Sequence, residues 1–423
     1  MSLLNELTWR GFVKQVTHDD LGAILDKESL TLYCGFDPTA DSLHIGSLLP
    51  IMGLAHFQRH GHRPLALVGG GTGLIGDPSG KTQERNMLDR AEVERNVVGI
   101  GKQLERFLDF TGDHAAVLLN NADWLCDIRL LDFLRDIGKH FSINMMLNRD
   151  SVRMRLEDRD HGISYTEFSY ILLQSYDFLY LNEQYDCRLQ VGGADQWGNI
   201  VSGMDLARRL RNAATYGLTF PLVTKTDGSK FGKSEDGNIW LDGSRTSPYK
   251  FYQFWLNQAD ADTGRYLRYF TFLSKDEIEE LDAQLLTEPH KRAAQRALAT
   301  EVTRLVHGQT ALDNAVAASK AMFGGDLSTL DARTLHEIFD EVPSAEFPFN
   351  ALQEGRLLLD ALVEAKVFAS KGEARRLVRN GGLYVNNIRI DSDDVRLNDA
   401  FLLSGNMTVI RTGKKNYHLL RFV

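Results

Sequence analysis

The alternation of strand-like and helix-like segments through the first two hundred residues limits the fold of this chain more than any other feature. The pattern predicts short apolar strands at 30–36, 64–70 and 187–193, and helices at 43–60 and 166–180. Strands that alternate with helices form a parallel sheet with helices on both faces. We therefore predict an α/β fold with a Rossmann-like parallel sheet, whose ligands bind beyond the carboxyl ends of the strands.

The second half of the chain has a different organisation. Residues 276–322 are rich in Ala, Leu, Glu and Arg, which predicts an α-helical domain, whereas 341–354 contains two prolines without clear periodicity, which predicts a linker. A compact unit follows, with a capping box at Ser370–Glu373 that opens a short helix and a hairpin turn at Asn386-Asn387. We predict a catalytic domain at 1–220, a Lys-rich loop with the helical domain at 221–325, a linker at 326–354 and a small α+β domain at 355–423.

Composition indicates a protein of the reducing cytoplasm. Cys34, Cys126 and Cys187 lie far apart, which argues against a disulfide framework and against a zinc site. The sequence shows neither a signal peptide nor an apolar run long enough to span a membrane. The net charge is −9, but residues 351–423 carry 12 Lys+Arg and 8 Asp+Glu, a net of +4, which leaves −13 for the rest. This asymmetry predicts that the C-terminal module contacts a polyanion.

A glycine-rich segment raises an alternative function. Gly71–Gly76 follows a predicted strand and matches GxGxxG, the pattern of a dinucleotide-binding turn. The helix that this motif requires is interrupted by Asp77-Pro78. A nicotinamide-dependent oxidoreductase rests on this segment alone. The other interpretations are a flexible glycine turn, or a cradle where the backbone approaches a ligand with Asp77 at its mouth.

Two further segments point to a nucleotide. His44 and Ser47 are predicted to share one face near a helix N-terminus, which attracts phosphate, and Gly46 between them leaves room for a flat ligand. Lys230–Ser234 lies in a stretch rich in Gly, Asp and Lys, which predicts a loop able to cover phosphates. This pair, about 190 residues apart, resembles the two motifs of class I aminoacyl-tRNA synthetases.

Longer motifs make the resemblance specific to the bacterial tyrosyl-tRNA synthetases, and it covers nearly the whole chain. They are Tyr33–His44, Leu74–Gly80, Phe133–Phe141 and Gly193–Asn199, with a C-terminal unit similar to the S4 RNA-binding fold. The resemblance implies a ligase that forms tyrosyl-adenylate from L-tyrosine and ATP and then transfers tyrosine to the 3′ end of tRNA(Tyr). One departure is Ser47, which stands where the family usually has a second histidine.

The residues themselves suggest the amino-acid pocket. Tyr170, Gln174 and Asp177 stand at i, i+4 and i+7, a polar stripe on an otherwise apolar helix. Polar groups that point into a core need partners, and a ligand with polar groups at two ends supplies them. The rise from Tyr170 to Asp177 is about 10 Å, comparable with the length of a tyrosine.

The resemblance then implies the role of each residue. For tyrosine it implies that Tyr170, Gln174 and Asp77 hold the ammonium, that Tyr33 and Asp177 bind the phenol hydroxyl, and that Gln190 and Gln196 line the carboxylate side. For ATP it implies contacts from Cys34, Gly35, Asp37, His44, Gly46, Ser47, Gly192, Gly193, Asp195, Lys230, Lys233 and Ser234. The expected catalytic groups are His44, Ser47, Thr39, Lys230 and Lys233.

The expected partners extend beyond the two small substrates. Mg²⁺ should accompany ATP without an all-protein cage, and no bound organic cofactor and no structural metal are expected. The predicted tRNA-binding residues are Arg208, Arg209, Lys371, Arg375, Arg379, Arg411, Lys414 and Lys415. Residues 133–141 resemble the family's dimer interface, so we expect a homodimer. The remaining alternatives are the related tryptophan enzyme, which Tyr33 with Asp177 disfavours, and an RNA-binding protein without catalysis.

Overall fold

The computed structural model describes the chain apart from residues 80–87, 148, 150–151, 154–155, 157–161, 229–230, 235–236, 322–323, 329, 340–341 and 414–415. It forms two compact units, Met1–Thr246 with Gln258–Val306, and Ser247–Asn257 with His307–Val423. Among the described residues, no helix combines the length and the apolar character needed to cross a membrane.

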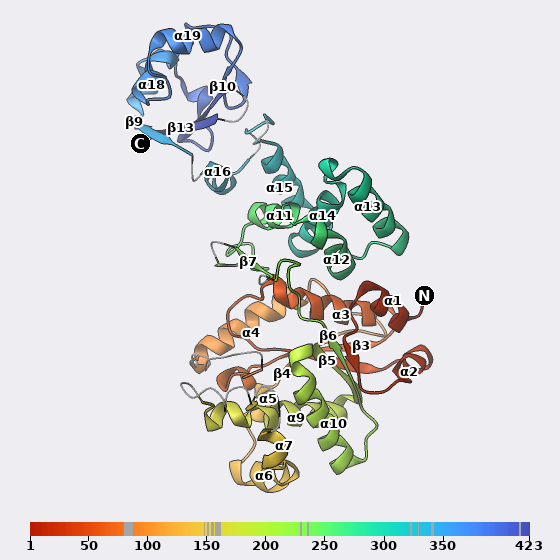
Figure 1. Cartoon of the computed structure of the whole chain (residues 1–423). Helices are drawn as coiled ribbons and strands as arrows, with labels where there is room; N and C mark the ends of the chain where they lie inside the picture. Colours follow the sequence, from red (N-terminus) through yellow and green to blue (C-terminus); the bar gives the residue numbers. More distant parts are fainter. Residues whose placement is uncertain are drawn as a thin grey trace. The chain divides into compact units, whose positions relative to one another are not determined.

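A six-stranded sheet in the order β1-β6-β5-β2-β3-β4 lies at the centre of the first unit (Figure 1). Its strands are β1 (Gln15–Val16), β2 (Thr31–Phe36), β3 (Arg63–Val68), β4 (Val117–Asn120), β5 (Cys187–Gly193) and β6 (Tyr216–Phe220). All neighbours pair in parallel except β1, which pairs antiparallel with β6. The mostly parallel sheet confirms the predicted fold class.

Helices cover the sheet of the first unit, and α9 and α10 pack against each other below it in Figure 1. Around the sheet lie α1 (Leu3–Arg10), α2 (Leu21–Lys27), η1 (Ile45–Ser47), α3 (Leu48–Arg59), η2 (Thr72–Leu74), α4 (Arg90–Leu104), α5 (Ala122–Leu125), α6 (Leu130–Asp136), η3 (Gly138–His140), α7 (Ile143–Leu147), α9 (Tyr165–Tyr185), η4 (Ala194–Gln196) and α10 (Trp197–Arg211). The unit continues with β7 (Lys233–Ser234), β8 (Gly237–Asn238), α12 (Asp260–Phe270), α13 (Lys275–Thr287), η5 (Pro289–Lys291) and α14 (Ala293–His307).

The predicted helix at 43–60 is wrong at its start. His44 is not helical: its backbone is extended, and it caps the short η1, after which α3 begins at Leu48. His44 and Ser47 therefore do not share a face of one α-helix. Pro50 falls in the first turn of α3, where a missing N–H costs no intrahelical hydrogen bond.

The strand order reverses between β2 and β5. From β2 the chain continues to β3 and β4 on one side, whereas β5 and β6 extend the sheet on the other side. The carboxyl ends of β2 and β5 thus diverge at a topological switch point, where open α/β sheets place their ligands.

The second unit contains a five-stranded sheet in the order β11-β10-β12-β13-β9. Its elements are α11 (Pro248–Leu256), α15 (Gln309–Ala321), α16 (Ala332–Phe339), β9 (Ser344–Phe347), α17 (Asn350–Gln353), α18 (Leu358–Glu364), α19 (Lys371–Arg379), β10 (Leu383–Val385), β11 (Ile388–Arg389), η6 (Asp399–Phe401), β12 (Met407–Thr412) and β13 (Asn416–Phe422). The predicted hairpin turn is present, since Asn386 and Asn387 both have positive φ.

The segment 326–354, predicted as a linker, is part of this unit instead. It contains α16, β9 and α17, and β9 pairs in parallel with β13. Alternate residues of β13 face two cores: Leu419 packs with Leu335 and Phe339 of α16, whereas Leu420 packs on the opposite side. Pro343 and Pro348 flank β9, so the local sequence did not predict a strand there. The strand is regular because it pairs with β13, more than seventy residues later in the chain.

Candidate active site

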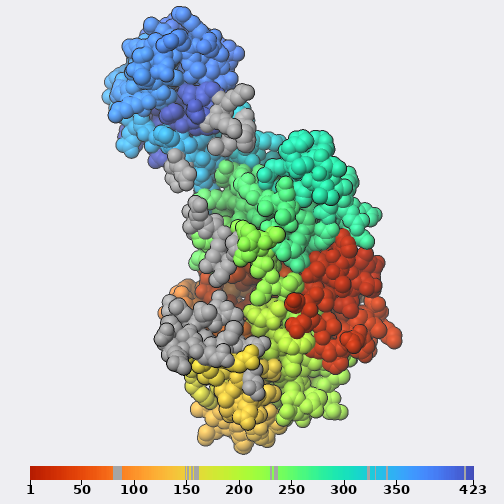
Figure 2. All heavy atoms as spheres, in the orientation of Figure 1, coloured from red at the N-terminus to blue at the C-terminus, as the bar shows by residue number. Residues whose placement is uncertain are grey.

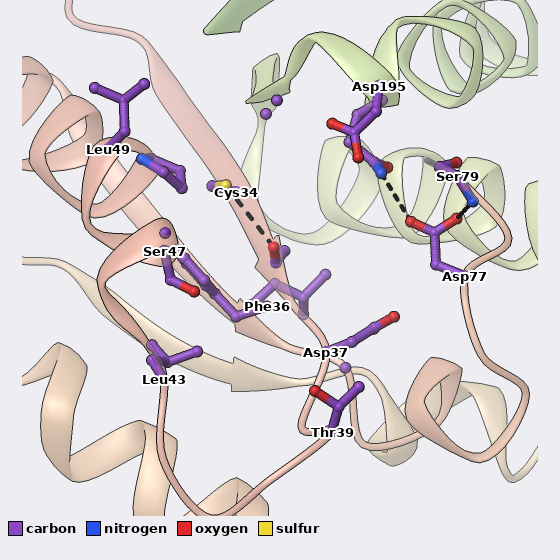
Figure 3. A pocket seen from close by; sticks show the side chains of 18 of the residues that line it. Cys34, Phe36, Asp37, Thr39, Leu43, Ser47, Leu49, Asp77, Ser79 and Asp195 are labelled. Carbon is purple, nitrogen blue, oxygen red and sulfur yellow. Dashed lines mark hydrogen bonds between the residues drawn. The ribbon is translucent and has the colours of Figure 1, made fainter. Parts of the chain in front are cut away.

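A cavity of about 590 Å³ lies at the switch point of the first unit. That volume is in the range of sites for small-molecule ligands. Figure 3 shows Ser47 and Leu49 on one side of it, Asp77, Ser79 and Asp195 on the other, and Cys34 on β2. The predicted residues that line it are Tyr33, Cys34, Gly35, Asp37, Thr39, His44, Gly46, Ser47, Asp77, Tyr170, Gln174, Asp177, Gln190, Gly192, Gly193, Asp195 and Gln196.

One part of the cavity has a hydroxyl without a partner beside a fixed carboxylate. The Tyr33 hydroxyl is buried and has no hydrogen-bond partner among the described residues. Close by, the Asp177 carboxylate accepts hydrogen bonds from Asn121 Nδ2 at 2.9 Å and Trp124 Nε1 at 2.8 Å. Burial raises the pKa of Asp177 to about 7, although both hydrogen bonds oppose the shift. Burial, with the nearby Asp177, raises the pKa of Tyr33 well above its usual range, so its hydroxyl stays protonated.

Polar groups further along α9 belong to two chains of hydrogen bonds. Tyr170 donates its hydroxyl to Asp37 at 3.0 Å, and Thr72 donates to the other oxygen of Asp37 at 2.8 Å. Asp37, predicted to contact ATP, is therefore already held by two hydroxyl groups. Burial and then Asp37 raise the pKa of Tyr170 well above its usual range.

The second chain contains Asp77. Its carboxylate accepts from Gln196 Nε2 at 2.7 Å. It also accepts from the Ser79 backbone N–H at 2.9 Å, and Figure 3 shows this bond between the two labelled residues. Asn199 Nδ2 donates to Gln174 Oε1 at 2.8 Å and to Gln196 Oε1 at 3.2 Å. The Oε1 atom of Gln190 is buried without a hydrogen-bond partner among the described residues. Asp77, Gln174 and Gln196 are thus held by the protein, whereas Gln190 presents an unused acceptor.

The structure brings the two nucleotide motifs together. The Gly46 backbone N–H donates to His44 Nδ1 at 3.0 Å, and a Cβ added at Gly46 would lie 2.7 Å from the His44 ring, so this position requires glycine. On the loop side, Ile239 N–H donates to Gly232 O, and Ile45 N–H donates to Ile239 O, each at 3.0 Å. Lys230 lies outside the described residues, as do the side chains of Lys233 and Ser234.

The ends of β2 and β5 leave space along their backbones. A Cβ added at Gly35 would meet nothing within 4 Å, whereas one at Gly193 would lie 2.4 Å from Asp195 Oδ1. Burial raises the pKa of the Cys34 thiol to about 12, so it stays protonated. This wall of the cavity contains the neutral Cys34 thiol, the Gly35 backbone and the Asp195 carboxylate. Because none of these groups is positively charged, the wall suits a sugar and a flat ring better than phosphates.

Comparison with known proteins identifies the family. Residues 25–324 match the family described as tRNA synthetases class I (W and Y), and residues 334–420 match the Tyrosine--tRNA ligase SYY-like C-terminal domain. The chain is 55% identical over 424 residues to the Tyrosine--tRNA ligase of Roseiflexus castenholzii, with all of both chains covered. It is 52% identical to that of Staphylococcus saprophyticus, over 100% of this chain and 99% of the relative. The chain belongs to the tyrosine–tRNA ligase family.

A solved structure supports this membership. The C-terminally truncated mitochondrial tyrosyl-tRNA synthetase of Coccidioides posadasii is 34% identical, with a TM-score of 0.66 over 74% of this chain and 91% of that one. In this ligase the glycines of Gly71–Gly76 do not open a dinucleotide-binding helix, because η2 ends at Leu74 and the described residues 77–79 are not helical. Family membership and this geometry exclude the oxidoreductase hypothesis, and the full-length relatives decide against the tryptophan enzyme.

Sequence reasoning missed residues of this ligase that hold the cavity in shape. Asn121 bridges Asp177 and Thr72 through Nδ2, while its Oδ1 accepts from the Gly71 N–H at 2.7 Å. Trp124 is 7% exposed and stacks on Tyr180. Asn121 follows β4 directly, so the rule that ligands bind beyond the carboxyl ends of strands could have found it had β4 been predicted.

Most of the described residues that are predicted to bind tRNA are exposed. Lys371, Arg375 and Arg379 are exposed on α19, with Lys371 paired to Asp360 at 2.7 Å and Arg375 to Asp393 at 3.2 Å. Arg208 and Arg209 are exposed on α10, and both pair with Asp205. Lys414 and Lys415 lie outside the described residues.

Arg411 differs from the other predicted tRNA-binding residues. It is 9% exposed, its guanidinium donates to Asn387 Oδ1 and Gly413 O, and it lies 3.6 Å from the centre of the Tyr384 ring. Arg411 is therefore not the exposed side chain expected of a predicted tRNA-binding residue, and its contacts hold the hairpin β10–β11 to the strand β12.

Proposed function

We propose that the cavity binds L-tyrosine and ATP, forms tyrosyl-adenylate with release of pyrophosphate, and transfers tyrosine to the 3′ end of tRNA(Tyr). The observation that supports it best is the Tyr33 hydroxyl, buried without a partner next to the fixed Asp177 carboxylate. A phenol hydroxyl satisfies both groups at once, since it donates to Asp177 and accepts from Tyr33. A ligand without that hydroxyl leaves the Tyr33 hydroxyl unsatisfied at a cost of about 1–3 kcal/mol.

The other end of tyrosine meets charge of the opposite sign. Its ammonium group donates hydrogen bonds to the Asp77 carboxylate, the Tyr170 hydroxyl and the Gln174 amide oxygen, which all belong to residues that line the cavity. Asp37 adds negative charge through its hydrogen bond to Tyr170. We assign the carboxylate of the substrate to the side of Gln190 and Gln196, where a side-chain amide N–H group can donate to it.

The first chemical step needs positioning more than proton transfer. The tyrosine carboxylate attacks the α-phosphate of ATP in line, forms a P–O bond and expels pyrophosphate, and it is already ionised at neutral pH. No side chain has to act as a general base. The negative charge that develops on the phosphates in the transition state is stabilised by two groups of residues. The first is His44 with Thr39 and Ser47, and the second is Lys230, Lys233 and Ser234 of the loop.

The rest of ATP lies along the ends of β2 and β5. Asp195 accepts from the ribose hydroxyls, Cys34 lies beside the sugar, and Gly46, Gly192 and Gly193 admit the adenosine. Mg²⁺ enters with ATP as part of the nucleotide substrate. Such a bound Mg²⁺ needs few protein ligands, and the described residues offer no cluster of three or more His, Cys, Asp or Glu that could hold a metal alone.

The tRNA contacts are assigned to exposed arginines and lysines. The exposed stripe Lys371, Arg375 and Arg379 grips the phosphate backbone, with Lys414 and Lys415 as further candidates, and Arg208 and Arg209 contact the acceptor arm. We place the reaction in the cytoplasm, where the three cysteines stay reduced.

A homodimer is the proposed assembly. Leu130, Leu131 and Ile143 are 69%, 77% and 58% exposed, and they flank the segment 133–141. Figure 2 shows this ochre and yellow region at the surface of the first unit. Apolar side chains gathered in this way mark a protein interface, and a second copy of the same surface covers them through a twofold axis. Leu131→Glu should therefore give a monomer in sedimentation equilibrium.

The test of the catalytic assignment is tyrosine-dependent exchange of pyrophosphate into ATP. Lys233→Ala should lower exchange about 10²–10³-fold, the range for loss of one group that stabilises transition-state charge. Tyrosine affinity, measured by equilibrium dialysis, should stay within twofold. Lys291→Ala, a surface lysine paired with Glu288, is the matched control. Equal exchange with phenylalanine, or full exchange by Lys233→Ala, contradicts the proposal.

A further inference from the structure

The helix α12 carries a row of side chains that hold the start of the lysine loop. Asp262, Arg265, Tyr266 and Phe270 are spaced at i, i+3, i+4 and i+8, which places them on one face of the helix. Each of them contacts Thr224, Thr226 or Phe231, three described residues of the segment 224–231 that precedes Lys233 in the chain. None of the four lines the cavity described above.

Asp262 makes the densest set of these contacts. It is 3% exposed, and one oxygen accepts from the Thr226 hydroxyl at 2.6 Å, the Thr226 backbone N–H at 3.0 Å and Arg265 Nη2 at 2.7 Å. The same Arg265 nitrogen donates to Thr224 O at 2.5 Å. Hydrogen bonds to an ionised acceptor are about twice as strong as neutral ones. One buried carboxylate therefore fixes two residues of the segment, one directly and one through Arg265.

Aromatic stacking holds the other end of the segment to the same helix. The Phe231 ring lies parallel to that of Phe270, with centroids 5.5 Å apart, and its centroid is 5.0 Å from that of Tyr266. Tyr266 and Phe270 are buried. The segment is thus attached to α12 at Thr224, Thr226 and Phe231.

The far end of the loop is attached to the histidine motif instead. Gly232 and Ile45 are joined through the backbone of Ile239, and Leu241 N–H donates to Leu43 O at 2.8 Å. Between these attachments Lys233 pairs with Asn238 and Ser234 with Gly237, so the lysine lies on a short hairpin. Because Lys233 follows Phe231 and Gly232 closely in the chain, a shift of the residues attached to α12 also shifts the backbone of Lys233.

We propose that Asp262 is a positioning residue for adenylate formation. It holds the base of the lysine hairpin at a fixed place relative to His44, so that Lys233 reaches the phosphates of ATP in the transition state. This inference rests on the proposed catalytic role of Lys233. A displacement of about 1 Å at a reacting group lowers rates by up to about 10²-fold, so a loosened base is visible in the rate.

The experiment compares Asp262→Asn with a matched control. Asp282→Asn removes the negative charge that pairs with Arg268 at 2.7 Å, a contact that also involves α12 but no loop residue. Asp262→Asn should slow single-turnover adenylate formation about 10- to 100-fold and leave tyrosine Kd within twofold. Asp282→Asn should leave both within twofold. Thr226→Val, which removes only one hydroxyl, should slow the step about threefold, because it loses one of the three hydrogen bonds to Asp262.

The double variant Asp262→Asn/Thr226→Val separates positioning from general destabilisation. Its effect should be smaller than the product of the two single effects, because both act on the contact between Asp262 and Thr226. If Asp262→Asn fails to fold, Thr226→Val alone decides: a slower step with unchanged tyrosine Kd supports the proposal, and an unchanged rate overturns it.

The remaining outcomes distinguish this inference from the function on which it rests. Equal loss of rate and tyrosine affinity, or the same loss in Asp282→Asn, overturns the positioning role. A normal rate in Asp262→Asn together with a slow Lys233→Ala overturns the positioning role and leaves the proposed function intact. A normal rate in Lys233→Ala overturns the proposed function itself.

Discussion

The substitution Tyr33→Phe tests the proposed pocket most directly, because the hydroxyl it removes has no partner among the described residues. That hydroxyl is buried beside Asp177, while the carboxylate keeps its bonds to Asn121 and Trp124. The change therefore breaks no hydrogen bond within the described structure. Its effects on the free protein and on the tyrosine complex should have opposite signs.

The magnitudes follow from the two states. In the free protein, removal of an unsatisfied buried hydroxyl relieves about 1–3 kcal/mol, and the small void left behind costs about 1 kcal/mol or less. Stability should therefore stay the same or rise by up to about 3 kcal/mol. In the tyrosine complex, one neutral hydrogen bond worth about 0.5–1.5 kcal/mol is lost. Tyrosine affinity should fall about 2- to 13-fold.

Two measurements follow from these estimates. Thermal unfolding should show a Tm equal to or above that of the wild type. Pyrophosphate exchange with tyrosine and with phenylalanine should show a lower kcat/KM for tyrosine and an unchanged or higher value for phenylalanine, because phenylalanine never satisfied the Tyr33 hydroxyl.

Two results would refute the reasoning about Tyr33. A Tm well below that of the wild type would mean that the hydroxyl is hydrogen-bonded in the free protein. Equal losses for tyrosine and phenylalanine would mean that Tyr33 shapes the pocket without touching the phenol hydroxyl.

Three further predictions concern other parts of the chain. Because burial raises the pKa of Asp177 to about 7, the carboxylate loses its charge as pH falls through 7, so tyrosine Kd should rise about tenfold from pH 8 to pH 6; a flat titration contradicts this. Gly193→Ala should raise the KM for ATP about tenfold or more and spare tyrosine Kd, because its Cβ displaces Asp195; equal effects on both substrates contradict it. A chain ending at Ala321 should elute as one species in size exclusion, whereas one ending at Asn350 should aggregate because the apolar side of α16 loses the strands that cover it; identical elution contradicts the shared core.

The sequence predicted the elements whose pattern is local. The strand at 187–193 has the predicted limits, because its apolar run ends in two glycines that the chain needs at the mouth of the cavity. The polar stripe Tyr170, Gln174 and Asp177 lines the cavity as predicted, since helical spacing alone puts these residues on one face.

The sequence failed where pairing at a distance decides the structure. His44 looked helical from its neighbours, but its backbone is extended and pairs with Trp240 nearly two hundred residues later. The strand β9 lies among prolines and is regular only because β13 pairs with it. Arg411 looked like a surface charge, yet the Tyr384 ring and the Asn387 amide enclose it. No local pattern reports such contacts.

The polar groups of the cavity divide by whether the protein already satisfies them, and this division explains how such a site can be selective. Asp177 and Asp77 are fixed by Asn121, Trp124 and Gln196, so tyrosine need not order them when it binds. The Tyr33 hydroxyl has no partner in the described structure, so it penalises any ligand that fails to reach it. Fixed groups contribute affinity at low entropic cost, and unsatisfied groups contribute discrimination. In the sequence, hydrogen-bonded and unsatisfied polar groups look alike, because both are polar residues in an apolar setting. The contacts of Asn121 and Trp124 show that Asp177 is already hydrogen-bonded by the protein, whereas Tyr33 is not.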